Sequence, residues 1–150
     1  MRKESIIDIK SGNIYGKGEE ETIILKGYYL YEDSNYAERV TIAIKDENNN
    51  IEEYPIKVNG YNLKVFLGKF SSKCSDDIYI YGEAGQSVRY AIAIIYKYSK
   101  GNLVEVFNGE KFSKKYSCIS RYLEKYRIEI ICKLYERSTL WILKIAVMII

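Results

Sequence analysis

The stretch that decides the fold covers residues 88–107 and reads VRYAIAIIYKYSKGNLVEVF. Its first part alternates at period two, so that Tyr90, Ile92 and Ile94 share one face of an extended strand. Residues 99–102 (SKGN) are typical of a turn, and residues 103–107 return to β-branched and apolar side chains. The stretch therefore predicts an antiparallel β-hairpin.

The same alternation recurs outward from this hairpin. The further predicted strands are Thr22–Tyr31, Val40–Ile44, Ile51–Val58, Leu63–Leu67 and Asp77–Tyr81, the last of them ending at Gly82. Polar turns are expected at residues 46–50 and 59–62. Pro55 cannot donate to a strand ladder, so its strand is expected at a sheet edge or at a bulge. The pattern predicts one all-β, mainly antiparallel domain.

The segment 111–137 carries two competing patterns. Tyr116, Ile119 and Leu123 are spaced as on one face of a helix, whereas residues 126–130 (YRIEI) alternate as in a strand. Four isoleucines between residues 119 and 131 favour a strand, because β-branched side chains lose rotamer freedom in helices. A strand is the preferred interpretation, with a helix as the alternative.

Composition excludes several kinds of chemistry. The 150 residues are 47% hydrophobic, which suits one globular domain, and they contain no His. A Ser-His or Cys-His nucleophile pair and a His-ligated metal are therefore excluded. Cys74, Cys118 and Cys132 form no C-x-x-C pair and indicate free thiols in a reducing compartment.

Charge is unevenly distributed along the chain. Residues 1–109 hold 14 Lys and Arg against 16 Asp and Glu, whereas residues 110–150 hold 9 against 4. Segment 110–137 also has tyrosines among its basic residues, so nucleic-acid or membrane-surface binding is an alternative function. Dispersed lysines are more typical of a solvated surface, which disfavours binding to nucleic acid and to a membrane surface.

The two ends of the chain carry expectations of their own. Residues 1–9 lack the apolar core of a signal peptide, which favours a cytoplasmic location. Residues 140–150 are apolar apart from Lys144 and too few to span a bilayer. Such an end is expected of a buried strand or of a longer chain that has been cut.

Two stretches 56 residues apart resemble each other. Residues 12–23 read GNIYGKGEEETI, and residues 68–79 read GKFSSKCSDDIY. Each begins with Gly, passes through a turn of small residues and reaches an acidic residue just before a predicted strand. The spacing predicts two repeats, over about residues 10–66 and 67–120.

The second stretch also carries a resemblance to a known family. Residues 67–70 (LGKF), with Asp77 and Ile78, are similar to the L-G-D-F-T-G-D-G-x-x-D-I loop of FG-GAP/VCBS-repeat proteins of low-GC Gram-positive bacteria. The order of turns and strands agrees over about residues 10–110. The resemblance implies an interaction module of β-propeller-like blades. Because two repeats cannot close a propeller, incomplete blades or a small β-sandwich are expected.

The family's loops bind Ca²⁺ through oxygen atoms at the first, third, fifth and ninth positions. The residues at these degenerate positions are Asn13, Tyr15, Lys17 and Glu21 in the first copy, and Lys69, Ser71, Lys73 and Asp77 in the second. An ammonium at the fifth position would repel the cation. We therefore expect no metal or other cofactor, and we expect ion pairs from Lys17 to Glu21 and from Lys73 to Asp77.

These observations favour a non-enzymatic interaction module. Its expected partner is another protein, or a second copy bound through exposed strand edges. The rival is a small hydrolase that uses the carboxylates at residues 19–21, 52–53 or 76–77. Adjacent residues of a strand point to opposite faces, so these doublets do not form a catalytic pair by themselves. No small-molecule substrate is evident.

Overall fold

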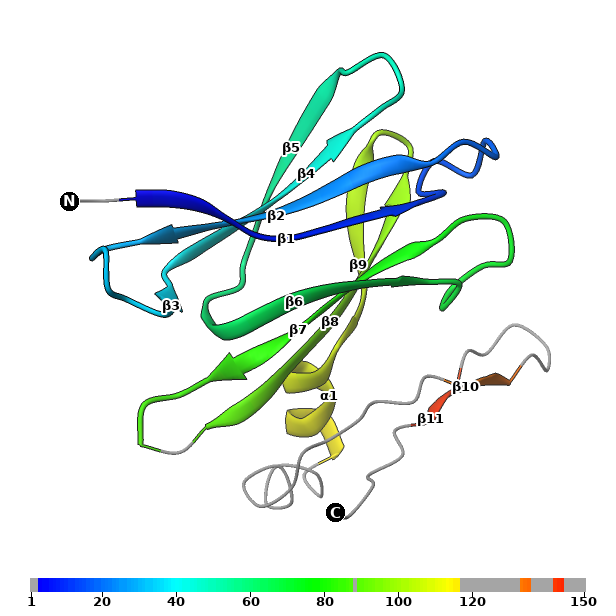
Figure 1. Cartoon of the computed structure of the whole chain (residues 1–150). Coiled ribbons are helices and arrows are strands. Elements are labelled where there is room, and N and C mark those ends of the chain that lie inside the picture. Colours follow the sequence, from blue (N-terminus) through cyan, green and yellow to red (C-terminus); the bar gives the residue numbers. More distant parts are fainter. Residues whose placement is uncertain (1–2, 88, 117–132, 136–141, 145–150) are drawn as a thin grey trace.

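A computed structural model describes residues 3–87, 89–116, 133–135 and 142–144 (Figure 1). It confirms the all-β fold: antiparallel strands form two large sheets and one short two-stranded pair. The strands of the large sheets are β1 (Lys3–Gly12), β2 (Glu21–Tyr29), β3 (Tyr36–Ala37), β4 (Arg39–Lys45), β5 (Ile51–Ile56), β6 (Gly60–Gly68), β7 (Asp77–Ala84), β8 (Tyr90–Ser99) and β9 (Asn102–Asn108). Helix α1 (Gly109–Tyr116) follows, and β10 (Lys133–Tyr135) pairs with β11 (Ile142–Lys144).

Sheet A has the strand order β1-β2-β4-β5. Its inner face is apolar because alternate residues of β2, such as Ile23 and Leu25, are buried. Its outer face carries the ion pair between Lys26 and Glu53. Pro55 lies in β5 at the sheet edge, which confirms the edge position predicted for that strand.

Sheet B has the strand order β3-β6-β7-β8-β9. The hairpin predicted from residues 88–107 is confirmed over its described part as β8 and β9. Strand β7 is buried on both faces, since neighbouring residues from Asp77 to Ile80 are all buried. Sheet B thus buries apolar side chains of β7 on both of its faces.

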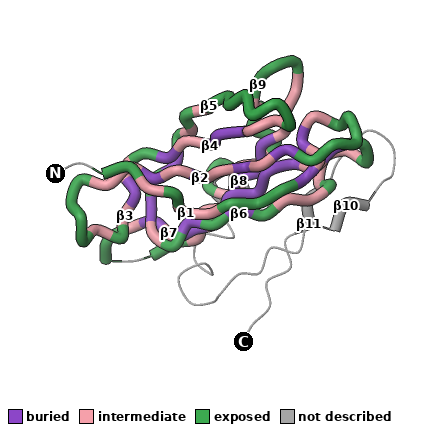
Figure 2. Tube along the Cα trace, turned by 45° about the horizontal axis from the view of Figure 1, so that its top comes forward, coloured by how far each residue is buried: buried purple, intermediate pink, exposed green. Residues whose placement is uncertain are grey.

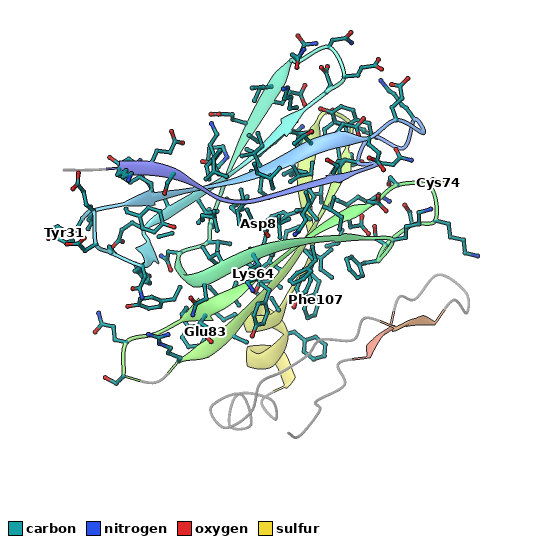
Figure 3. All side chains as sticks on the ribbon, in the orientation of Figure 1. Asp8, Tyr31, Lys64, Cys74, Glu83 and Phe107 are labelled. Atoms are coloured by element: carbon teal, nitrogen blue, oxygen red, sulfur yellow. The ribbon has the colours of Figure 1, made fainter. Side chains whose placement is uncertain are left out.

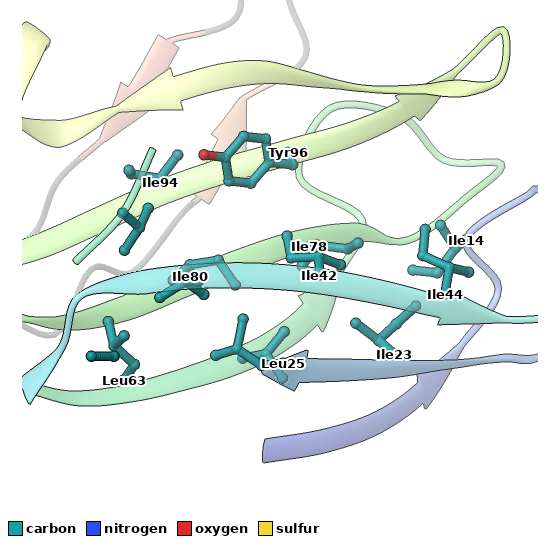
Figure 4. Close-up of a cluster of buried hydrophobic side chains, with 14 residues drawn as sticks. Ile14, Ile23, Leu25, Ile42, Ile44, Leu63, Ile78, Ile80, Ile94 and Tyr96 are labelled. Atoms are coloured by element: carbon teal, nitrogen blue, oxygen red, sulfur yellow. The ribbon is translucent and has the colours of Figure 1, made fainter. Parts of the chain in front are cut away.

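The main core lies between the two sheets. Figure 4 shows side chains of β2 and β4, such as Leu25 and Ile42, beside Ile78 and Ile80 of β7. Figure 2 shows these buried positions along the inner strands. Strands β1 and β6 also approach each other, and the Val65 N–H donates to Asp8 Oδ2 at 3.1 Å. The two sheets therefore form a small β-sandwich that is closed along β1 and β6.

Several strand boundaries differ from those predicted: β2 ends at Tyr29 and β5 at Ile56, and two differences in sheet B have a clear cause. The expected turn at 59–62 is wrong, because β6 begins at Gly60 and has a bulge where Asn62 takes a left-handed φ of 51°. The expected end of β7 at Gly82 is also wrong. A Cβ on Gly82 would lie 2.4 Å from Leu63 Cδ2, so this glycine allows close packing inside the sheet and does not form a turn.

The strand preferred for 111–137 is wrong at its beginning, where α1 forms. Asn108 Oδ1 accepts from the N–H groups of Glu110 and Lys111 at 3.1 and 3.2 Å, and so caps the helix. Glu110 lies in the first turn, where a negative charge is favourable. Farther along, residues 133–135 form the strand β10, and residues 117–132 and 136–137 lie outside the described residues.

Candidate functional site: a loop pair and an edge groove

The first candidate site is the loop pair, residues 13–20 between β1 and β2 and residues 69–76 between β6 and β7. The Asn13 N–H donates to Asp76 Oδ2 at 2.9 Å, and the Asp76 N–H donates to the Asn13 carbonyl at 2.7 Å. Figure 3 shows Cys74 near the tip of the second loop, where its thiol is free and exposed. The structure thus brings together two loops that sequence analysis placed 56 residues apart.

Each loop is held by the carboxylate that begins the following strand. Glu21 Oε2 accepts from the N–H groups of Ile14 and Tyr15 at 2.8 and 3.1 Å. In the second loop, Asp77 accepts from the N–H and the hydroxyl of Ser71. Burial raises the pKa of the Asp77 carboxyl, and its hydrogen bonds with Ser71 oppose that shift. Both carboxylates therefore bond to their own loops.

The ion pair expected from Lys17 is not what holds Glu21. Lys17 is exposed, and its Nζ lies 5.9 Å from the centroid of the Tyr15 ring. Asn13, at the first degenerate position, accepts from the Gly18 N–H through Oδ1 at 3.3 Å. Backbone N–H groups bond both Glu21 and Asp77, because a tight loop must satisfy its own buried donors. Lys69 and Lys73 are exposed.

The strands inside each of the two hairpins that carry these loops pair in the same register. Gly12 is opposite Glu21 in sheet A, and Gly68 is opposite Asp77 in sheet B. Each residue of the second pair lies 56 positions after its counterpart. Both hairpins also have a register shift at matching places, between Ile6 and Asp8 and between Tyr61 and Lys64.

The second candidate site is the edge groove, an open cavity of about 310 Å³ along β5 and β9. Its lining combines aromatic, aliphatic and charged side chains. The lining residues are Glu53, Tyr54, Pro55, Ile56, Lys57, Tyr96, Asn102, Leu103 and Glu105. This groove lies on the side of the sandwich opposite β1 and β6, where both sheets end in an edge strand. It is large enough for side chains of a bound segment.

A tyrosine cluster lies beside the edge groove. The hydroxyls of Tyr54 and Tyr15 donate to Glu52 Oε2 at 2.6 and 3.3 Å. The Tyr15 ring packs on Tyr98 with centroids 4.5 Å apart. Burial first, then the charge and hydrogen bond of Glu52, raises the pKa of Tyr15 and of Tyr54. The cluster joins the first loop, β5 and the β8–β9 hairpin.

The carboxylates proposed for a hydrolase are dispersed over different contacts. Glu52 bonds to tyrosines, Glu53 to Lys26, and Asp76 to the Asn13 N–H. Glu19 raises the pKa of the neighbouring Glu47 carboxyl by its charge, but both residues are exposed. Within the described part of the chain, no three His, Cys, Asp or Glu residues are grouped to hold a metal ion.

The predicted nucleic-acid or membrane-binding segment, residues 110–137, lies largely outside the described residues. Of the basic segment 110–137, the structure describes the backbone of α1 and β10. None of the described helices has the length and apolar character needed to cross a membrane.

Comparisons with known proteins give no match. The chain matches no family model, no curated protein and no solved structure. Sequence analysis missed the edge groove, although Pro55 had marked one of its strands as an edge. The other edge strand, β9, lies beside β5 only through tertiary packing, and the sequence carries no local signal for that packing.

Proposed function

We propose that this protein is a non-enzymatic interaction module that binds an extended segment of a partner protein in the edge groove. The observation that carries the proposal is the groove itself, where two edge strands flank an aromatic and aliphatic lining. Edge strands present unpaired N–H and C=O groups that can pair with an added strand. Tyr54, Tyr96 and Leu103 would receive the segment's apolar side chains.

The difference between the sheet edges supports this location. Strand β1 carries Lys3 and Lys10 along its length, which oppose strand addition. Strand β9 contains no Lys, Arg or Pro, and its Val104 and Val106 are 47% and 44% exposed. Its single charged residue, Glu105, already pairs with Lys111. The β9 edge therefore offers main-chain pairing with little electrostatic opposition.

The loop pair supports a role as scaffold. We infer that the chain is a divergent relative of FG-GAP/VCBS-repeat proteins, with two blade-like units whose calcium sites have been lost. Matching register in the two hairpins supports a common origin for the units. Lysines at the fifth loop positions and carboxylates bonded to backbone N–H groups support the loss of calcium binding.

The proposal is tested by selecting a random peptide library, displayed on phage, against the full-length protein. We expect enriched peptides with alternating apolar residues, and fluorescence polarisation then gives their affinities. Tyr54→Ala removes an aromatic wall of the groove and should weaken binding about tenfold or more, as expected for an interface hot spot. Ile9→Ala is the matched control, because Ile9 is an exposed apolar residue on the β1 edge.

The outcomes separate the proposal from its rivals. Binding that Tyr54→Ala weakens and Ile9→Ala preserves supports the edge groove. Failure to enrich any peptide, or equal loss in both variants, contradicts it. Sedimentation of the protein alone identifies a second copy as the natural partner if Tyr54→Ala dissociates a dimer.

A further inference from the structure

The outer face of sheet B, which points away from sheet A, has an apolar centre, with Lys64 and Lys97 farther out on the same face. Tyr79, Ala93 and Ile95 form a buried cluster on it, and they are 8%, 5% and 1% exposed. Phe66 pairs across from Tyr79 on the same face, with ring centroids 5.8 Å apart, yet it is 46% exposed. The face therefore has a buried centre and a rim on which exposed apolar side chains lie among lysines.

Residue numbering in the two hairpins makes the outer face of sheet B equivalent to the inner face of sheet A, which sheet B already covers. A shift of 56 positions relates Ile23 and Leu25 of β2 to Tyr79 and Tyr81 of β7. The side chains of Ile23 and Leu25 form the inner face of sheet A and pack on sheet B. The equivalent positions in sheet B point outward, toward a further layer.

Helix α1 carries the chain onto this outer face. Its Phe112 ring lies 5.9 Å from Phe107, which belongs to the same cluster. Gly109 begins the helix against Ala93, where a Cβ would lie 3.3 Å from the Ala93 Cβ. Residues 117–150 follow directly after α1, and Leu134 and Leu143 pair in the antiparallel strands β10 and β11. The following segment thus starts at the face and contains strand-forming sequence.

We propose that residues 117–150 dock on the outer face of sheet B as a third layer. The contact would bury the rim around Phe66 and Val104 as sheet B buries the inner face of sheet A. The occupant is this chain's own segment because it begins beside the buried cluster and has an apolar stretch at residues 140–150. This inference is independent of the edge groove.

The only tryptophan of the chain, Trp141, lies in the proposed third layer and reports its docking. In the full-length protein, excited where tyrosine does not absorb, Trp141 should emit at short wavelength and resist acrylamide quenching. Phe66→Lys places a charge on the rim of the face. It should shift the emission to longer wavelength and increase quenching.

Ile9→Lys is the matched control, because Ile9 is 49% exposed on the outer face of sheet A. It should leave the Trp141 emission unchanged, and circular dichroism shows whether each variant remains folded. Wild-type emission at the wavelength of a solvated tryptophan would overturn the proposal. Equal spectra for the two variants would also overturn it, as would short-wavelength emission that disappears on dilution, because that result assigns the contact to a second copy.

Discussion

At the scale of single residues, the loop pair depends on two acidic side chains at the starts of strands. Glu21 is 3% exposed and Asp77 is fully buried, and each carboxylate accepts two hydrogen bonds from its own loop. Sequence analysis found both acids and the loops they belong to. It assigned Glu21 the wrong partner, because the Lys17 side chain reaches solvent at little cost whereas buried N–H groups need acceptors.

Glu21→Ala should lower the free energy of unfolding by about 3 kcal/mol, because the N–H groups of Ile14 and Tyr15 lose a charged acceptor. Glu21→Gln keeps the accepting oxygen and should cost about 1 kcal/mol or less. Urea unfolding of both variants measures the difference. Equal losses would show that the negative charge matters more than the hydrogen bonds.

The burial of Tyr96 makes the stability of the fold depend on pH in the alkaline range. Burial, with a smaller contribution from the charge of Glu105, raises the pKa of Tyr96 to about 12 from its usual 10.0. Between these two values the folded state binds more protons than the unfolded state, so stability must fall as pH rises. The slope contributed by Tyr96 can reach about 1.4 kcal/mol per pH unit.

Unfolding followed by urea from pH 9 to 12 should therefore show a steeper loss in the wild type than in Tyr96→Phe. Identical slopes in the two proteins would contradict the burial of this hydroxyl.

At the scale of elements, period-two alternation predicted the strands with one buried face. It also predicted the β8–β9 hairpin, because its turn sequence is local. Strand β1 was missed because Ile6 and Ile9 are exposed and Ile7 lies at a bulge, which disrupts the alternation. Helix α1 was missed although Asn108 and Glu110 carry an N-cap signal, because the strand pattern before them was read as a hairpin end.

The junction of β6 and β7 gives a test of packing between elements. Gly82→Ala would place a methyl group 2.4 Å from Leu63 Cδ2 and should cost about 1–3 kcal/mol of stability. Leu63→Val removes the conflicting atom, so the double variant should be more stable than the sum of the two single effects predicts. Strict additivity in a double-mutant cycle would show that the glycine does not serve this contact.

At the scale of the whole molecule, the four-stranded sheet A and the five-stranded sheet B pack through non-equivalent faces, and their loops meet. The bonds that fix this arrangement join distant residues: Asp8 with Val65 and Asn13 with Asp76, which are 57 and 63 positions apart. The class of fold followed from local alternation. The edge groove, the loop contact and the second apolar face of sheet B depend on such long-range packing, for which one sequence carries no local pattern.

The central claim is that the loop pair is a scaffold held by its own carboxylates. Its most direct test compares urea unfolding of the full-length protein in millimolar CaCl₂ and in EDTA at matched ionic strength. We predict equal free energies of unfolding within about 0.4 kcal/mol, because Glu21 and Asp77 already bond to backbone N–H groups. Stabilisation by about 2.7 kcal/mol, the value expected when a ligand is present at 100 times its Kd, would contradict the claim.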